Sequence, residues 1–164
     1  MIPEPMRKSL QERVAAAVTP REAAVAVMKA LQSHYGWLTD GAVEEAADLL
    51  AMTTLQVEEL ATFYEMIYRR PVGRRVIHVC DSISCWSTGS GEVMAHLQGR
   101  LGIEPGGTTT DGMFTLIPCC CLGNCGEGPT MMVGDTLYGS LTRERVDEIL
   151  EKERKEVSGA DVPT

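Results

Sequence analysis

Residues 80–85 read CDSISC and residues 119–125 read CCCLGNC, and these two stretches decide how the chain is interpreted. They hold all six cysteines of the 164-residue chain. Each follows a short run of β-branched and apolar residues that predicts a strand, over 75–80 and over 114–117. Each cysteine group is therefore expected in a loop at the end of a strand. Such loops can be neighbours in space although they are far apart in sequence.

The spacing of the cysteines favours a metal centre with four thiolate ligands, a C-x4-C pair from the first loop and a C-x3-C pair from the second. A [2Fe–2S] cluster fits two separated pairs, because each of its two irons takes two thiolates. Zinc remains an alternative, although its usual ligand pair is C-x2-C, and so do redox thiols or inert, buried cysteines. A thiol–disulfide enzyme is disfavoured because there is no C-x-x-C motif. A Rieske centre is disfavoured because no histidine lies in a cysteine loop.

The second loop has more cysteines than a pair requires. Cys125 is expected to be a ligand, whereas Cys119, Cys120 and Cys121 compete for the other place. Neighbouring residues near a strand end point in opposite directions, so all three cannot face one metal. Spacing alone leaves this choice open. The glycines at 123, 126 and 128 allow the backbone to approach sulfur and direct N–H groups toward it, which supports a cluster.

The composition, with 44% hydrophobic and 23% charged residues, is that of an ordinary globular protein. The formal charge is -8, from 15 Lys and Arg against 23 Asp and Glu. Nucleic acid and anionic lipid are disfavoured as partners, because both require a basic surface. The N-terminus shows no signal-peptide core and no apolar run approaches a membrane span, so we expect a cytoplasmic protein without direct membrane insertion. In a reducing cytosol, clustered cysteines are more often metal ligands or redox thiols than disulfides.

Residues 1–70 predict a bundle of four short amphipathic helices. The apolar stripes are Leu10, Val14, Ala17 and Val18; Ala24, Met28, Leu31 and Tyr35; Val43, Ala46, Ala47 and Leu50; and Val57, Leu60, Ala61 and Tyr64. Capping boxes are expected at Thr19 with Glu22 and at Thr53 with Gln56, and Gly36 is expected to end the second helix. Nothing in this part suggests a catalytic site.

Residues 71–157 predict a small α/β layer structure in the order β-α-β-β-β-α, followed by a tail over 158–164. The expected elements are a strand over 75–80, a helix over 93–101, a strand over 114–117 that stops at Pro118, a hairpin over 130–138 with its turn at Gly134-Asp135, and a helix that opens at Leu141. Strands that alternate with helices indicate helices packed on a small sheet.

Three stretches resemble a known family. They are CDSISC at 80–85, DGMFTLIPCCCLGNCGEGPTMMV at 111–133 and ATFYEMIYRRPVG at 61–73. They are similar to the thioredoxin-like [2Fe–2S] ferredoxin family, in its branch of NuoE-type subunits of bacterial NADH:quinone oxidoreductase (respiratory complex I). The resemblance extends from about Pro20 to Leu150. It includes the helical part, which stand-alone thioredoxin-like ferredoxins lack.

The resemblance implies a four-helix bundle followed by a thioredoxin-like domain, which is a small mixed sheet with flanking helices. It also implies one [2Fe–2S] cluster. The family pattern C-x4-C…C-L-G-x-C falls on Cys80, Cys85, Cys121 and Cys125. Under this resemblance, the other two cysteines of the second loop are extra.

The resemblance further implies an electron-transfer role beside a flavoprotein subunit that binds FMN and NADH. That subunit belongs to the peripheral arm of complex I, on the cytoplasmic side of the inner membrane. The chain is then an oxidoreductase subunit with no catalytic site of its own. The alternative is the equivalent small subunit of an NAD-dependent formate dehydrogenase or an NAD-reducing hydrogenase. A zinc-stabilised interaction module is a more remote alternative.

Overall fold

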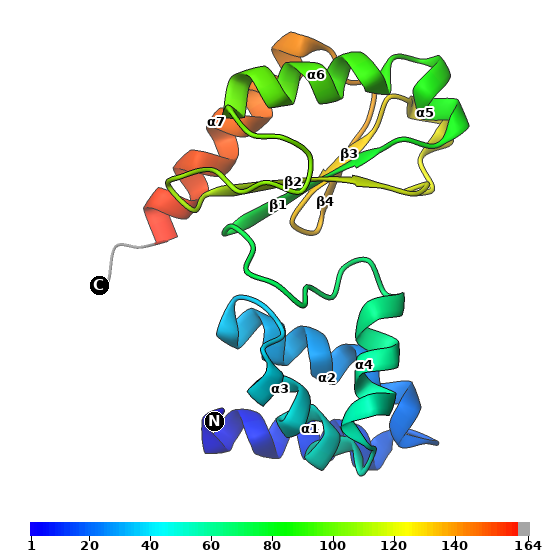
Figure 1. Cartoon of the computed structure of the whole chain (residues 1–164), viewed down its shortest axis with the longest axis vertical. Coiled ribbons are helices and arrows are strands. Elements are labelled where there is room, and N and C mark those ends of the chain that lie inside the picture. Colours follow the sequence, from blue (N-terminus) through cyan, green and yellow to red (C-terminus); the bar gives the residue numbers. More distant parts are fainter. Residues whose placement is uncertain (161–164) are drawn as a thin grey trace. The chain divides into compact units, whose positions relative to one another are not determined.

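The computed structural model describes residues 1–160 of the chain, with side chains as far as Val157 (Figure 1). The chain divides into two compact units, Met1–Pro71 and Val72–Thr164. The first unit is helical, and the second combines helices with a four-stranded sheet, which confirms the expected fold class. Among the described helices, none is both long and apolar enough to cross a lipid bilayer.

The helical unit buries one apolar cluster between four helices. They are α1 (Glu4–Ala16), α2 (Pro20–Tyr35), α3 (Asp40–Leu50) and α4 (Thr54–Phe63). The expected stripes supply most of this core, including Leu10, Ala24, Met28, Leu31, Val43, Ala46, Ala47, Leu50, Val57, Leu60 and Ala61. Val18 and Tyr64 were expected to face inward and are exposed, because each lies just beyond the end of a helix, where the helical period no longer applies. Gly36 ends α2 with a left-handed φ of 84°, as predicted.

The two helix starts with predicted capping boxes differ. At α4, the Thr53 side chain accepts the Gln56 N–H at 3.2 Å and the Gln56 side chain accepts the Thr53 N–H at 2.9 Å. This capping box is confirmed. At α2 the prediction is wrong, because Thr19 makes no side-chain cap hydrogen bond. The Glu22 carboxylate reaches one residue further back and accepts the N–H of Val18 at 3.0 Å.

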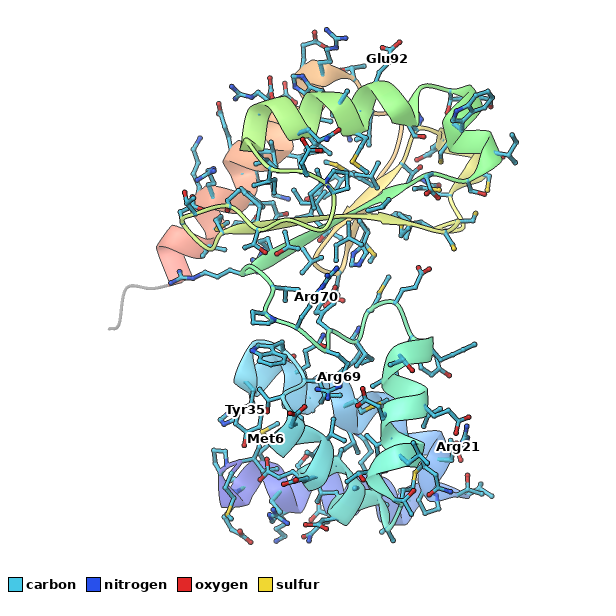
Figure 2. The ribbon with its side chains drawn as sticks, in the orientation of Figure 1. Met6, Arg21, Tyr35, Arg69, Arg70 and Glu92 are labelled. Carbon is cyan, nitrogen blue, oxygen red and sulfur yellow. The ribbon has the colours of Figure 1, made fainter. Side chains whose placement is uncertain are left out.

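The segment that follows α4 is held against α2 and α3 by polar side chains. The buried amide of Gln32 in α2 donates to the carbonyl of Met66 at 3.0 Å and accepts the N–H of Tyr68 at 2.6 Å. Arg69, labelled in Figure 2, binds the carboxylates of Asp40 and Glu58 and the carbonyl of Leu38. These contacts fix the end of the helical unit to its own helices.

The α/β unit contains a mixed sheet with the strand order β2-β1-β3-β4. Its elements are β1 (Arg75–Cys80), α5 (Ile83–Ser87), α6 (Ser90–Leu101), β2 (Phe114–Cys119), the 3-10 helix η1 (Cys125–Glu127), β3 (Met131–Val133), β4 (Thr136–Tyr138) and α7 (Arg143–Ala160). β1 and β2 are parallel, whereas β3 is antiparallel to β1 and to β4. The order agrees with the prediction, with α5 and η1 added inside the cysteine loops. α7 includes residues 158–160 of the expected tail, and residues 161–164 lie outside the described part of the chain.

β2 continues through Pro118 to Cys119, although it was expected to stop at the proline. Pro118 lies opposite Val79 of β1 and is exposed. β2 is the outer strand in the sheet order, where a residue without an N–H is tolerated because that side need not pair with another strand. As a result, β1 and β2 both end on a cysteine, with Cys80 opposite Cys119.

The sheet packs against α6 and α7, and Figure 1 shows α6 running across it. The core they share includes Ile77, Val79, Phe114, Leu116, Met131 and Val133 of the strands, Val93 and Leu97 of α6, and Val146, Ile149 and Leu150 of α7. The buried Glu153 of α7 binds Arg75 at the start of β1 at 2.8 Å and the Tyr138 hydroxyl of β4 at 3.0 Å. The sheet is thus anchored by its helices, and the loops at the far end of β1 and β2 carry the cysteines.

Candidate iron–sulfur site

The first cysteine pair is positioned by the end of β1 and by α5. Cys80 is the last residue of β1, and its N–H donates to the carbonyl of Thr130 at 3.1 Å. α5 begins after Ser82 and carries Cys85. Both cysteines are buried, with Cys80 1% and Cys85 2% exposed. The sequence did not predict α5, because a helix of 5 residues is too short to show an apolar period.

The second cysteine pair lies in the loop between β2 and β3. The Sγ atoms of Cys121 and Cys125 are 3.3 Å apart. Gly123 lies between them with a φ of 80°, a left-handed conformation that favours glycine. Its N–H donates to the Cys121 sulfur at 3.4 Å. Both cysteines are exposed, in contrast to the first pair.

The two pairs meet at the sulfur of Cys80. This sulfur forms one hydrogen bond with Cys85 and another with Cys121. Cys121 in turn contacts Cys125. The structure therefore brings four sulfur atoms together from two loops that are about 35 residues apart in the chain, as loops at the same end of adjacent strands allow.

The remaining cysteines, Cys119 and Cys120, lie at the end of β2. Cys119 is paired in register with Cys80 and is 5% exposed. Cys120 is the first residue beyond the strand and is exposed. Adjacent side chains diverge at a strand end, as the sequence predicted. The third cysteine of this run, Cys121, is the one whose sulfur contacts both Cys80 and Cys125.

The thiols of the second loop differ in how readily they ionise. The Gly123 N–H and the thiol of Cys125 lower the pKa of Cys121, because both donate to its sulfur. The same contact raises the pKa of Cys125. In the first loop, burial is the main cause that raises the pKa of Cys85. Within the second pair, Cys121 therefore forms the thiolate first, and the thiolate is the form that binds metal.

The description "Thioredoxin-like [2Fe-2S] ferredoxin" is that of a protein family whose pattern matches residues 10–154 of this chain. The chain belongs to the thioredoxin-like [2Fe–2S] ferredoxin family. The match spans the helical stripes as well as both cysteine loops, and it confirms the resemblance found in the motifs. Family membership supports an iron–sulfur cluster as the group that this ferredoxin fold carries.

Several ferredoxins of this family that are similar over most of the chain are named as subunits of NADH-quinone oxidoreductase. The one from Escherichia coli strain K12 is 47% identical over 133 residues, which cover 81% of this chain and 80% of the relative. The one from Pseudomonas aeruginosa is 40% identical over 151 residues, covering 92% of this chain and 91% of the relative.

A solved structure extends the fold comparison beyond these relatives. The crystal structure of an NAD+-reducing [NiFe]-hydrogenase in the air-oxidised state has a TM-score of 0.68 to this chain at 22% identity. The similarity covers 84% of this chain and 24% of that chain, so this ferredoxin spans about a quarter of that chain's length. At this identity the comparison shows the fold alone.

The donors around the four sulfur atoms fit a [2Fe–2S] cluster. Each loop supplies two thiolates, which is the number that each iron takes. Hydrogen-bond donors also reach the sulfur atoms: the Gly123 N–H reaches Cys121, the Ser84 hydroxyl reaches Cys125, and the N–H and hydroxyl of Thr130 reach Cys85. Donors of this kind stabilise anionic sulfur and orient the ligands.

Sequence reasoning identified Gly123 as such a donor and missed Ser84 and Thr130. Ser84 could have been found as a hydroxyl residue inside the C-x4-C motif, whereas Thr130 lies beyond both motifs and only the fold brings it to Cys85. Gly128 has a different use from the one expected. A Cβ atom there would lie 2.6 Å from Thr88 Oγ1, so the glycine allows the second loop to pack against the end of α5.

Proposed function

We propose that this chain holds one [2Fe–2S] cluster on Cys80, Cys85, Cys121 and Cys125 and serves as an electron-transfer subunit of an NADH:quinone oxidoreductase. The observation that carries the proposal is the convergence of these four sulfur atoms from two loops of a thioredoxin-like ferredoxin fold. The names of relatives that are 40% to 47% identical over most of the chain support the assignment to that complex.

The two loops contribute differently to such a site. A [2Fe–2S] cluster, when bound, accepts and releases single electrons. The buried pair, Cys80 and Cys85, holds its side of the site away from water, while the exposed pair, Cys121 and Cys125, leaves the other side accessible. Hydride chemistry belongs to a flavin, so this chain alone is expected to turn over no substrate.

The proposed partner is a flavoprotein subunit that binds FMN and NADH, within the peripheral arm of complex I on the cytoplasmic side of the inner membrane. The surface next to the site supports a protein partner. α5 carries Ile83 and Trp86, which are 72% and 68% exposed, on the same short helix as Cys85. Large apolar side chains next to an accessible redox site are typical of a surface that another subunit covers.

A second candidate is the equivalent small subunit of an NAD-reducing hydrogenase or an NAD-dependent formate dehydrogenase. The fold similarity to a chain of an NAD+-reducing [NiFe]-hydrogenase is the observation that favours it. That similarity comes with 22% identity, whereas the relative from Escherichia coli is 47% identical. The higher identity favours the complex I assignment.

Metal analysis and EPR test the cluster. The purified full chain should be coloured, contain two irons and two acid-labile sulfides per chain, and give an S = 1/2 EPR signal after dithionite reduction. A colourless protein that contains zinc and stays silent by EPR would instead support the zinc-stabilised interaction module and overturn the electron-transfer proposal.

Co-purification of the tagged chain from its own cells tests the partner. An FMN-containing subunit together with quinone-reducing activity supports complex I, whereas hydrogenase or formate dehydrogenase subunits support the second candidate. Trp86→Ser should reduce the yield of the partner several-fold and leave the EPR signal of the chain unchanged. The matched control is Leu137→Ser, which changes an exposed apolar residue on β4. Equal loss of the partner in both variants would contradict a docking role for α5.

A further inference from the structure

Two hydroxyl residues, Ser84 and Thr130, each serve a sulfur atom of the opposite cysteine loop. Ser84 lies in α5, within the first loop, and its hydroxyl hydrogen bonds to Cys125 of the second loop. Thr130 follows the second loop, and it hydrogen bonds to Cys85 of the first loop. The exchange ties the two pairs of sulfur atoms together from both directions.

The fold holds the Ser84 hydroxyl in place through its own short helix. The Ser84 carbonyl accepts the hydroxyl of Ser87 at 2.9 Å and the hydroxyl of Thr88 at 3.0 Å. Thr88 also contacts the position where a Cβ atom of Gly128 would lie. The end of α5 is thus locked against the second loop, and this keeps the Ser84 hydroxyl beside the Cys125 sulfur.

Thr130 is fixed still more firmly, because it is 1% exposed and its peptide groups face both cysteines of the first loop. Its carbonyl accepts the N–H of Cys80 at 3.1 Å, and its N–H donates to the Cys85 sulfur. Its hydroxyl also lies 3.3 Å from the Glu127 carbonyl and 3.4 Å from the Asn124 carbonyl. Both of these contacts are longer than an ordinary O–H···O hydrogen bond, so the Cys85 sulfur competes well for the hydroxyl proton.

We propose that the hydroxyl groups of Ser84 and Thr130 raise the reduction potential of the cluster bound by these cysteines. The inference rests on the proposed function. Reduction adds one electron and one negative charge, which the sulfur ligands share. A fixed donor to sulfur stabilises the more negative state more strongly than the less negative one. In a chain of formal charge -8, such donors offset part of the repulsion that opposes the added electron.

The two effects should be nearly additive, because the hydroxyls serve sulfur atoms of different loops and share no acceptor among the ligands. Each is expected to be moderate. The N–H of Thr130 still reaches Cys85 when the hydroxyl is removed, and water has access to the exposed Cys125 when Ser84 is changed.

The test is an EPR-monitored redox titration of the full chain with its cluster. Ser84→Ala and Thr130→Val should each lower the equilibrium constant for one-electron reduction about threefold, and the double variant about tenfold. For a one-electron couple, the tenfold change is a shift of about 59 mV toward negative potential. The matched control is Ser87→Ala, which removes a hydroxyl of α5 that donates to a carbonyl, and its potential should equal that of the wild type.

The outcomes separate this inference from the proposed function. A wild-type chain without a [2Fe–2S] signal contradicts the proposed function. Full clusters with unchanged potentials in Ser84→Ala and in the double variant overturn the inference and leave the proposed function standing. If the buried change Thr130→Val costs the cluster itself, Ser84→Ala alone decides, because Ser84 is only half-buried and its removal leaves no cavity in the core.

Discussion

The helical unit uses its buried polar side chain within itself, whereas the α/β unit brings reactive sulfur atoms together at one end of its sheet. In the first unit, the two ends of the Gln32 amide are matched to a backbone carbonyl and a backbone N–H. In the second, Cys80, Cys85 and their exposed partners of the second loop contact one another. The difference teaches that the first unit is complete as a protein structure, while the second depends on a bound group. Substitutions should therefore affect one unit without the other.

The largest expected effect is loss of the cluster on removal of a ligand. Cys80→Ala, Cys85→Ala, Cys121→Ala and Cys125→Ala should each abolish the iron content and the EPR signal, because an iron left with one protein thiolate is not retained. Structural metal sites contribute directly to folding, so the α/β unit should also lose protection of its amides against hydrogen exchange. The amides of the helical unit should keep theirs.

The extra cysteines provide the matched controls for this series. Cys119→Ala and Cys120→Ala should retain iron, sulfide and the EPR signal, because it is the sulfur of Cys121 that contacts Cys80 and Cys125. Loss of iron in Cys120→Ala but not in Cys121→Ala would contradict the ligand assignment. Loss of protection in the helical unit of Cys85→Ala would contradict the independence of the two units.

A smaller effect is expected from the opposite experiment, in the helical unit. Gln32→Leu removes an amide that binds Met66 O and Tyr68 N–H, and it should lower the free energy of unfolding of this unit by about 2 kcal/mol. Chemical denaturation followed by far-UV circular dichroism measures the change. The EPR signal should be unchanged, since no ligand is touched.

Ser33→Ala is the control for this variant, because Ser33 is the next residue of α2 and is exposed. Its hydroxyl donates only to the carbonyl one turn earlier, at Lys29, so the change should cost little. A Gln32→Leu variant as stable as Ser33→Ala would show that the amide does not hold the segment after α4. A changed EPR signal would show that the two units are coupled.

Much of this contrast could be predicted from the sequence, because it depends on local patterns. The apolar stripes placed the four helices, and the β-branched runs placed the strands that lead into the cysteines. Spacing gave two pairs of thiolates and left three candidates for one place. Only the family resemblance selected Cys121, and the sulfur contacts agree with that selection.

The misses share a physical cause, which is dependence on tertiary position. β2 continues through Pro118 because the strand is at the edge of the sheet, and a sequence does not state which strand is outermost. Thr130 donates to Cys85 only because the fold brings the start of β3 next to α5. Val18 and Tyr64 match the helical period but lie beyond the helix ends, where other interactions decide exposure.

The smallest effect compares two starts of helices in the helical unit. Thr53→Ala should destabilise the unit by about 1 kcal/mol, because the Thr53 side chain accepts the Gln56 N–H and the capping box is complete. Thr19→Ala should change the stability by a few tenths of a kcal/mol at most, since the Thr19 side chain makes no cap hydrogen bond. Both threonines precede a helix, and both have a glutamine or glutamate three residues later, so the sequence pattern alone predicts equal costs. Denaturant midpoints of the two variants therefore distinguish the pattern from the geometry, and equal losses of stability would contradict the observed α2 start, where Glu22 binds Val18 instead.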